Sequence, residues 1–370
     1  MDILFLANSL EMGGIEKNLV RLTGELVSRG HKVIAASRGG SLRAELVGAG
    51  GQHVELAMTA RPGPLARDIK TMREVLRRED PDIIHTFSAT SNVVLLLASQ
   101  RFGGRTAPVV SSPMGLQNSP DESRARILLR AYALTIGAER IIVTAPAIGA
   151  VLDRLPLRSE MSELPVQGVV VPRGDVPAAH VREELGLDDE HRVVLTIGRL
   201  NASKSHDLFI RAAKEACFRD PRIRCLIVGE GELRHELEEQ IEALGLGKRV
   251  RLLGERLDIY PLLRAADVYV RPGVVEGFAG ITVLEAQAVG VPVVAFTTED
   301  VKLSITDGVT GKLVPTGSVA ALADAILEIL DDAEFASRLV VAARRHVHSH
   351  FGIQAIVDRL EELYADVAST

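Results

Sequence analysis

Short apolar runs that alternate with longer helical periods are the feature that most constrains the fold of this chain. Strands are predicted near residues 2–7, 32–37, 82–85, 108–112, 140–143 and 168–171, and again near 193–198, 224–229, 250–254, 268–272 and 291–296. Helical patterns fill the gaps, as in residues 15–30, where apolar residues recur every three or four positions before Gly30. Such alternation is typical of βαβ units with buried parallel strands. The sequence therefore predicts an α/β protein built on parallel sheets.

The chain is long enough for two hydrophobic cores, since 370 residues exceed what a single core usually serves. The alternation of strands and helices breaks at residues 171–192, where Pro, Gly and acidic residues displace the apolar pattern. It then restarts and ends in three predicted helices, near 319–330, 334–348 and 352–367. We therefore expect the interdomain linker to lie at this break in the pattern, between a domain over residues 1–172 and one over 173–350.

The composition is that of a globular protein and argues against some partners. Apolar residues make up 46% and charged residues 25%, and the formal net charge is -6. Such a mild charge gives no reason to expect a nucleic-acid partner. Residues 1–173 carry 21 Lys and Arg against 17 Asp and Glu, whereas the remainder carries 22 against 32. A basic first half fits an anionic acceptor or a lipid surface, and it equally fits ordinary variation among solvated faces.

The sequence predicts neither a disulfide framework nor a metal site. The two cysteines, Cys217 and Cys225, lack the spacing of metal ligands and are expected to be buried reduced thiols. The Asp-x-Asp sequence at 80–82 precedes a strand and is interpreted as a turn. The N-terminal MDILFLANS is too short for a secretory signal, and no segment reaches the length of a membrane span. We expect a cytoplasmic protein, either free or peripheral on the inner face of a membrane.

The first candidate site is the stretch ANSLEMGGIEKN, because ligands of parallel α/β sheets bind beyond the carboxyl ends of the strands. Gly13 and Gly14 lie here between the first strand and the first helix. Paired glycines let backbone N–H groups approach a phosphate at a helix N-terminus. A simple tight turn would explain them as well, and neither a P-loop nor a GxGxxG spacing is present.

The second candidate is TIGRLNASKSHD, which places Arg199 and Lys204 directly after the strand that opens the second domain. Arg can bind a diphosphate through a bidentate fork, and Lys acts on it as a point charge. Surface cations are usually only solvated, but this position beyond a strand favours a function in anion binding.

The third candidate is EGFAGITVLEAQAVGVPVVAF, residues 276–296, whose VLEAQAVG part is predicted to be a helix that ends at Gly290. The helix would begin in GFAG (Gly277, Phe278, Ala279 and Gly280) and point free N–H groups at a bound anion. Ionised carboxylates accept hydrogen bonds from pairs of vicinal hydroxyl groups, so Glu276 could hold a hexose and Glu285 a ribose. Glu276 is also explained as an acidic residue near a helix start.

These stretches, in this order, resemble the retaining glycosyltransferases of family 4, glycosyl transferases group 1. The likeness spans nearly the whole chain through MGGIEKN, PDIIH, VLTIGRLNASK, CLIVGEGELR, VRLLGE, ADVYVRPGVVEGFAGITVLEAQAVGVPVVAF and DGVTGKLVP. It implies a GT-B fold, in which two Rossmann-like domains with parallel sheets face a central cleft. It also implies that a C-terminal helix, residues 351–370, packs back on the N-terminal domain.

The resemblance implies a nucleotide-sugar donor bound mainly to the second domain, with the acceptor on the side of the first. The diphosphate would lie on Arg199 and Lys204, the ribose on Glu285, and the transferred sugar near Glu276. Catalysis would come chiefly from positioning and from stabilising the charge of the departing diphosphate.

Further roles follow from the same resemblance. The base would lie against the backbone around Leu253 to Arg256, which includes Gly254 and Glu255. The Gly13–Gly14 loop would cover the diphosphate from the first domain. His85, in PDIIHTFS, is the candidate for a catalytic histidine, although a histidine at a strand end is more often a hydrogen-bonded structural residue.

The sequence departs from the family's pattern at four places. Eight residues separate Glu276 from Glu285, where the family usually has seven. The stretch VVSSPMGLQ has no histidine after the fourth predicted strand, Phe87 stands where a second histidine is common, and Ser205 replaces a frequent glycine. The first of these puts the placement of Glu276 in question.

We therefore expect a metal-independent retaining hexosyltransferase that acts on a glycan, lipid-linked or small-molecule acceptor. Its donor is expected to be a UDP-sugar, with GDP-sugar and ADP-sugar as alternatives, because no motif identifies the base. A sugar-nucleotide epimerase of GT-B fold and a non-catalytic nucleotide-sugar-binding subunit remain as other interpretations.

Overall fold

The structure, a computed structural model, consists of two compact units. The first unit combines Met1–Gly168 with His350–Thr370, and the second is Val169–Ser349. The structure describes all residues except 12, 59–61, 100–106, 114–130, 132, 134, 136, 145, 158, 166–167, 171–177, 275–279 and 370. Among the described residues, no helix is both long and apolar enough to span a membrane.

The first unit is built on a seven-stranded sheet with the order β3-β2-β1-β4-β5-β6-β7, in which all neighbours are parallel. Its strands are β1 (Asp2–Leu6), β2 (Lys32–Ser37), β3 (Gln52–Glu55), β4 (Ile83–Thr86), β5 (Val109–Ser111), β6 (Arg140–Val143) and β7 (Glu160–Glu163). Its helices include α1 (Gly14–Ser28), α2 (Arg43–Gly48), α3 (Pro62–Glu79), α4 (Ala89–Ser99), α6 (Pro146–Leu152) and α14 (Ile353–Ser369).

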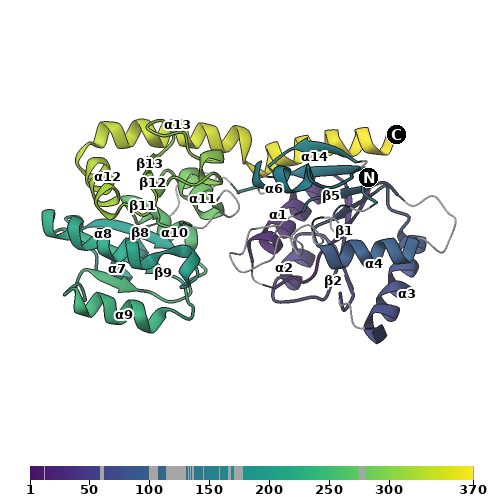
Figure 1. Cartoon of the computed structure of the whole chain (residues 1–370), viewed down its shortest axis with the longest axis horizontal. Coiled ribbons are helices and arrows are strands. Elements are labelled where there is room, and N and C mark those ends of the chain that lie inside the picture. The colour runs from purple at the N-terminus through teal and green to yellow at the C-terminus, as the bar shows by residue number, and fades with distance from the viewer. Residues whose placement is uncertain are drawn as a thin grey trace. The chain divides into compact units, whose positions relative to one another are not determined.

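The last helix, α14, belongs to the first unit although it ends the chain. Figure 1 shows it in yellow beside the purple and blue elements of that unit. It packs against α1, and the Arg29 guanidinium donates to Asp358 at 2.5 Å and to Glu361 at 2.7 Å. Tyr364 from α14 is completely buried in the first unit. The first unit is therefore made from both ends of the chain.

The second unit is built on a six-stranded parallel sheet with the order β10-β9-β8-β11-β12-β13. Its strands are β8 (Arg192–Ile197), β9 (Ile223–Val228), β10 (Val250–Leu252), β11 (Val268–Arg271), β12 (Val293–Phe296) and β13 (Lys312–Val314). Its helices are α7 (Ala179–Glu184), α8 (His206–Arg219), α9 (Arg234–Ala243), α10 (Ile259–Arg264), α11 (Ile281–Val289), α12 (Val319–Asp331) and α13 (Ala333–His350), with short 3₁₀ turns at Ala202–Lys204 and Val301–Leu303.

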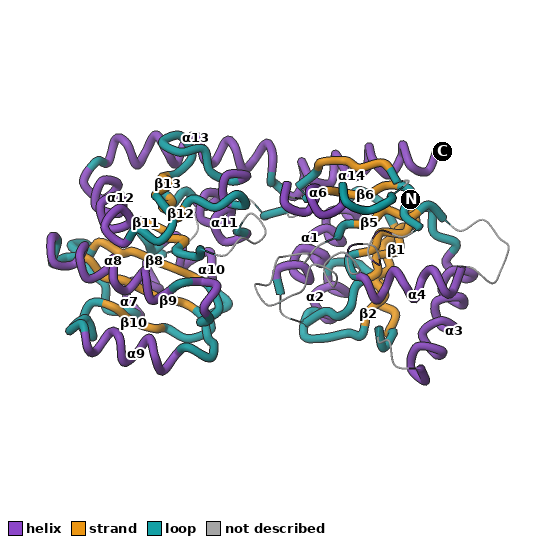
Figure 2. Tube along the Cα trace, in the orientation of Figure 1, coloured by secondary structure: helices purple, strands orange, loops and turns teal. Residues whose placement is uncertain are grey.

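Apolar side chains cover both faces of this second sheet, which explains its uninterrupted apolar strands. In β8, Val194 packs into a core with residues of α8 and α12, whereas Val193 and Leu195 pack into a second core with residues of α10 and α11. Figure 2 shows the orange strands of this unit lying between its purple helices. The second unit therefore has a hydrophobic core on each face of its sheet.

The predicted fold class, α/β with parallel sheets in two domains, is confirmed. Most predicted strands lie within two residues of the observed ones, but β3, β7 and β13 were not predicted. The strand predicted at 168–171 is wrong over its described part, where the structure has only a single bridging residue at Val169. The missed strands lie at sheet edges, where the apolar pattern is weakest.

Candidate functional site

The second sheet changes direction between β8 and β11. The chain proceeds outward from β8 to β9 and β10, and then returns to β11 on the other side of β8. Loops after two such neighbouring strands diverge, and ligands of open α/β sheets bind at this point beyond the carboxyl ends. Arg199 follows β8, and Gly280, the N-cap of α11, lies on the connection after β11, so these two candidate residues are positioned at the switch point, whereas Gly254 and Glu255 follow the edge strand β10.

Backbone contacts hold together the loops that follow β8, β9 and β10. The N–H of Gly198 donates to Val228 O at 2.9 Å, and the N–H of Gly229 donates to Gly254 O at 2.8 Å. Gly229 has a φ of +143°, and a Cβ at this position would collide with the carbonyl oxygen of Gly198. Only glycine therefore fits at Gly229 without moving the backbone that leads into Arg199.

Lys204 lies at the end of a 3₁₀ turn that starts at Ala202 and is followed by Ser205, whose φ is +50°. Part of the lysine side chain remains exposed. Burial of the ammonium group nevertheless lowers its pKa, and the positive charge of Arg271 lowers it further. The carboxylate of Asp300 opposes this shift. Lys204 thus lies among other charged groups at the switch point, as an anion-binding lysine would, and the exposed Arg199 is one of those groups, since its charge also lowers the pKa of Lys204.

The helix α11 begins at the same switch point. Its N-cap residue, Gly280, has a φ of +58° and no side chain that could cap the helix, and among the described residues the N–H of Val283 donates to the carbonyl of Gly280 at 2.7 Å. Glu285, one turn further along, is only 7% exposed and lies close enough to Tyr269 to raise the pKa of that phenol, although burial of the ring is the larger cause. A buried carboxylate on a helix whose N-terminus has no side-chain cap suits a polyhydroxylated anion.

The remaining candidates of the second unit differ in how far the structure describes them. Gly254 is half-buried with a φ of +76°, and Glu255 is exposed directly after it. Glu276, Gly277, Phe278 and Ala279 lie outside the described residues.

In the first unit, Gly13 is the N-cap of α1 in an extended conformation, and Gly14 is its first residue. A Cβ on Gly13 would collide with the carboxylate of Glu16, whereas space is open around Gly14. Burial raises the pKa of Glu16, and a backbone hydrogen bond opposes this shift. The carboxylate of Glu16 therefore occupies the N-terminus of α1, where a phosphate was expected.

His85 lies in β4 and is completely buried. Its Nδ1 hydrogen bonds with the Tyr364 hydroxyl at 2.6 Å, and its Nε2 with the Ser112 hydroxyl at 2.7 Å. The ring also stacks on Phe87, with 4.2 Å between ring centroids. Both ring nitrogens are thus engaged, which matches the structural alternative that the sequence left open for this histidine.

The burial of two histidines predicts a loss of stability in acid. Burial lowers the pKa of His85 to about 3 and that of His206 to about 4, whereas an unfolded histidine titrates near 6.5. The unfolded chain therefore binds more protons than the folded one below about pH 6.5, and stability falls as the pH drops from there towards 4. The slope for His85 alone is at most about 1.4 kcal/mol per pH unit.

Urea unfolding at pH 7, 6 and 5 measures this slope. His85→Gln should unfold at lower urea concentration at pH 7 and show a shallower loss below it, while the matched change at the exposed His348 leaves the slope as in the wild type. An identical slope in the wild type and His85→Gln would contradict the assignment.

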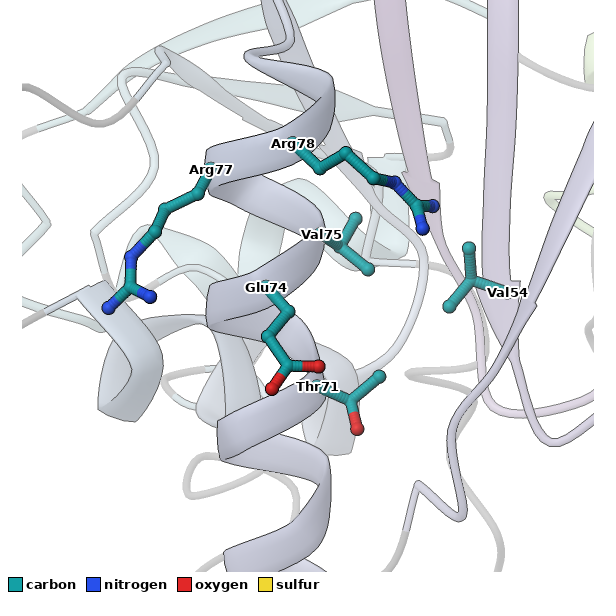
Figure 3. Close-up of a pocket in the computed structure, with 6 residues that line it drawn as sticks. All are labelled: Val54, Thr71, Glu74, Val75, Arg77 and Arg78. Carbon is teal, nitrogen blue, oxygen red and sulfur yellow. The ribbon is translucent and has the colours of Figure 1, made fainter.

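A hollow of about 450 Å³ lies in the first unit, between α3 and the edge strand β3 (Figure 3). It is lined by Val54, Thr71, Glu74, Val75, Arg77 and Arg78. Figure 3 shows Arg78 and Val75 directed toward Val54, with Arg77 directed to the opposite side of the helix. None of the predicted site residues lines this hollow.

The structure also reveals charged residues that the sequence did not single out. Arg271 ends β11, and its guanidinium pairs with Asp300 at 2.7 Å; the two side chains are 11% and 3% exposed. The sequence contained one signal for Arg271, since it is a cation at the carboxyl end of an apolar strand. Its partner Asp300 follows a different strand, β12, so the pair itself had no local signal.

Two family models match the chain, one in each unit. The model described as glycosyltransferase family 4 matches residues 12–164, and the model described as glycosyl transferases group 1 matches residues 178–346. Together they extend over both parallel-sheet units.

Curated relatives include several proteins named D-inositol 3-phosphate glycosyltransferase. The protein from Corynebacterium aurimucosum is 34% identical over 209 residues, which cover 54% of this chain and 48% of the relative. This match thus spans about half the length of that relative. The protein from Thermomonospora curvata is 29% identical over 405 aligned positions, which cover 97% of this chain and 92% of the relative.

Among solved structures, the crystal structure of Anabaena HepE in complex with UDP and glucose superposes with a TM-score of 0.83. The superposition covers 99% of this chain and 100% of HepE at 21% sequence identity. At this identity the likeness establishes the fold, two Rossmann-like domains of the GT-B class.

Proposed function

Because the chain belongs to the group 1 glycosyltransferases of family 4, with the GT-B fold, we propose that it transfers a hexose from a nucleoside-diphosphate sugar to a hydroxyl group with retention of configuration. The observation that carries this proposal is the arrangement of charges within the second unit. Lys204, Glu285 and the start of α11 gather at the carboxyl ends of β8 and β11, with the exposed Arg199 directly after β8. Cations beside a helix N-terminus suit a diphosphate, and a buried carboxylate suits the ribose hydroxyl groups.

In this proposal Arg199 and Lys204 bind the diphosphate and stabilise the charge that develops on it as the glycosidic bond breaks. Glu285 accepts hydrogen bonds from the ribose, the backbone at Gly254 and Glu255 lies against the base, and Glu276 contacts the transferred sugar. Much of the catalytic effect would then come from holding the donor in one orientation. The Gly13–Gly14 loop would supply further N–H groups once the Glu16 carboxylate gives way to a phosphate.

For the donor we propose a UDP-sugar, since HepE, which has a similar fold, was crystallised with UDP and glucose. For the acceptor we propose a hydroxyl compound that is itself anionic, or a lipid-linked glycan reached from the cytoplasmic face of a membrane. The excess of Lys and Arg over Asp and Glu in residues 1–173 supports either choice. His85 has no direct contact with substrate in this proposal, because both of its ring nitrogens are engaged inside the first unit.

Thermal stabilisation by UDP, GDP and ADP at equal concentrations tests the proposal. A ligand at 100 times its dissociation constant adds about 2.7 kcal/mol to the stability of the folded protein. We expect the largest shift with UDP, and we expect it to be lost in Arg199→Ala. A shift from none of the three nucleotides, with no nucleotide release from their glucose conjugates, would contradict the proposed activity.

A further inference from the structure

Arg271 makes an unusually complete set of contacts for a residue at the end of a strand. Its Nη2 donates to Asp300 Oδ2 at 2.7 Å, and its Nη1 donates to Thr298 Oγ1 at 3.1 Å and to the carbonyl of Gly273 at 3.3 Å. The Thr298 hydroxyl in turn donates to Asp300 Oδ1 at 2.5 Å. Thr298 and Asp300 follow β12, so this network joins the carboxyl ends of β11 and β12.

The guanidinium lies between the two ends of the connection from β11 to α11. It holds the carbonyl of Gly273 at the first end. At the second end, a Cβ built on Gly280 would lie 3.4 Å from Arg271 Nε, which places the N-cap of α11 against the guanidinium. Close packing around Gly273 also reaches the turn before α8, because a Cβ there would lie 3.2 Å from the carbonyl oxygen of Ser203 and 3.8 Å from Cα of Lys204.

Stability alone is a weak reason for such a network. The Arg271 and Asp300 side chains are almost completely buried, and removing two charges from water costs about as much as their attraction returns. A pair of apolar residues could fill the same volume. Apolar residues could not bind the carbonyl of Gly273 or fix the direction from which the chain enters α11.

We propose that Arg271, held in place by Asp300 and Thr298, is a positioning residue that fixes the start of α11 and the Lys204 turn in the geometry that the donor requires. This inference rests on the proposed donor site. Its effect is exerted through other groups, since three of its five N–H groups donate to Gly273, Thr298 and Asp300 and its Nε faces the N-cap of α11. The donor would gain a preformed helix N-terminus and a lysine that need no rearrangement on binding.

Arg271→Lys tests the inference, because it keeps the charge but cannot span Asp300, Thr298 and Gly273 at once. We expect the dissociation constant of the free nucleotide to rise and kcat for nucleotide release from the donor sugar to fall, each at least tenfold, while the midpoint of urea unfolding stays close to that of the wild type. We also expect the amides of Ile281–Glu285 to exchange with deuterium at least tenfold faster in the ligand-free variant.

Arg192→Lys is the matched control. Arg192 opens β8 at the opposite end of the same sheet and pairs with Asp220 at 3.0 Å and Asp331 at 2.6 Å. This variant should keep the wild-type kcat and the wild-type exchange in α11.

Two results would overturn the inference. One is unchanged exchange in α11 after Arg271→Lys, and the other is a parallel loss of nucleotide affinity, kcat and global stability, which a merely structural pair would produce. The exchange measurement needs no activity, so it separates failure of this inference from failure of the proposed function. A wild-type protein that binds none of the nucleotides would count against the function only.

Discussion

Arg199→Ala is expected to lower kcat/KM for release of the nucleotide from its sugar by about 100- to 1000-fold, the loss typical when one group that stabilises transition-state charge is removed. Glu285→Gln keeps the volume of the side chain but removes its charge, and we expect a loss of about 100-fold. Both variants should retain the wild-type unfolding temperature within a few degrees, because Arg199 is exposed and Gln fills the space of Glu285. Product formation with the nucleotide sugar that stabilises the wild type best is the measurement.

Lys214→Ala supplies the control for the loss of a cation. Lys214 is exposed on α8 of the same unit but lies outside the loops at the carboxyl ends of the strands. It should keep full activity. Wild-type activity in both Arg199→Ala and Glu285→Gln would rule out the assigned donor site, whereas loss in Lys214→Ala as well would indicate a general effect of charge.

Gly229→Ala should be among the most damaging single substitutions in the second unit. The φ of +143° at this glycine is strained for any other residue, and the added Cβ would collide with the carbonyl oxygen of Gly198. We expect a loss of about 3 to 5 kcal/mol in the free energy of unfolding, at the upper end for single mutations. The residual folded protein should also bind nucleotide poorly, because the displaced carbonyl immediately precedes Arg199.

Gly245→Ala separates the effect of the steric collision at Gly229 from the effect of backbone strain at a positive φ. Gly245 also has a positive φ, +69°, but the space around a Cβ at that position is open. We expect it to cost about 1 kcal/mol and to leave nucleotide binding intact. Urea unfolding of both variants, followed by nucleotide titration, makes the comparison; equal losses would mean that the contact with Gly198 contributes nothing.

The central strands could be predicted from the sequence because both of their faces are buried. In β8, neighbouring residues such as Val193 and Val194 enter separate cores, which makes the strand an uninterrupted apolar run. Edge strands lack this signal. The sequence of β7 is EMSE and that of β3 is QHVE, and neither contains a run of apolar residues. Pairing with one neighbouring strand, rather than composition, makes them strands.

The candidate site was predictable only where its residues follow strands directly. Arg199 could be located because it comes after a recognisable apolar strand, and the same rule would have pointed to Arg271. The ion pair of Arg271 with Asp300 joins residues 29 positions apart, and the hydrogen bond of His85 with Tyr364 joins residues 279 apart. Contacts between residues so far apart in the sequence depend on how whole elements pack together, and a local sequence pattern does not reveal that packing.

The return of α14 to the first unit has a consequence for how the protein is made. On the ribosome, residues 1–168 emerge first, yet their core is incomplete until the final helix has been synthesised. Until then, Nδ1 of His85 lacks the Tyr364 hydroxyl, and Arg29 lacks its partners on α14. The second unit, an uninterrupted segment, can therefore fold before the first is finished. The order in which the two units can be completed is thus the reverse of the order in which their synthesis begins.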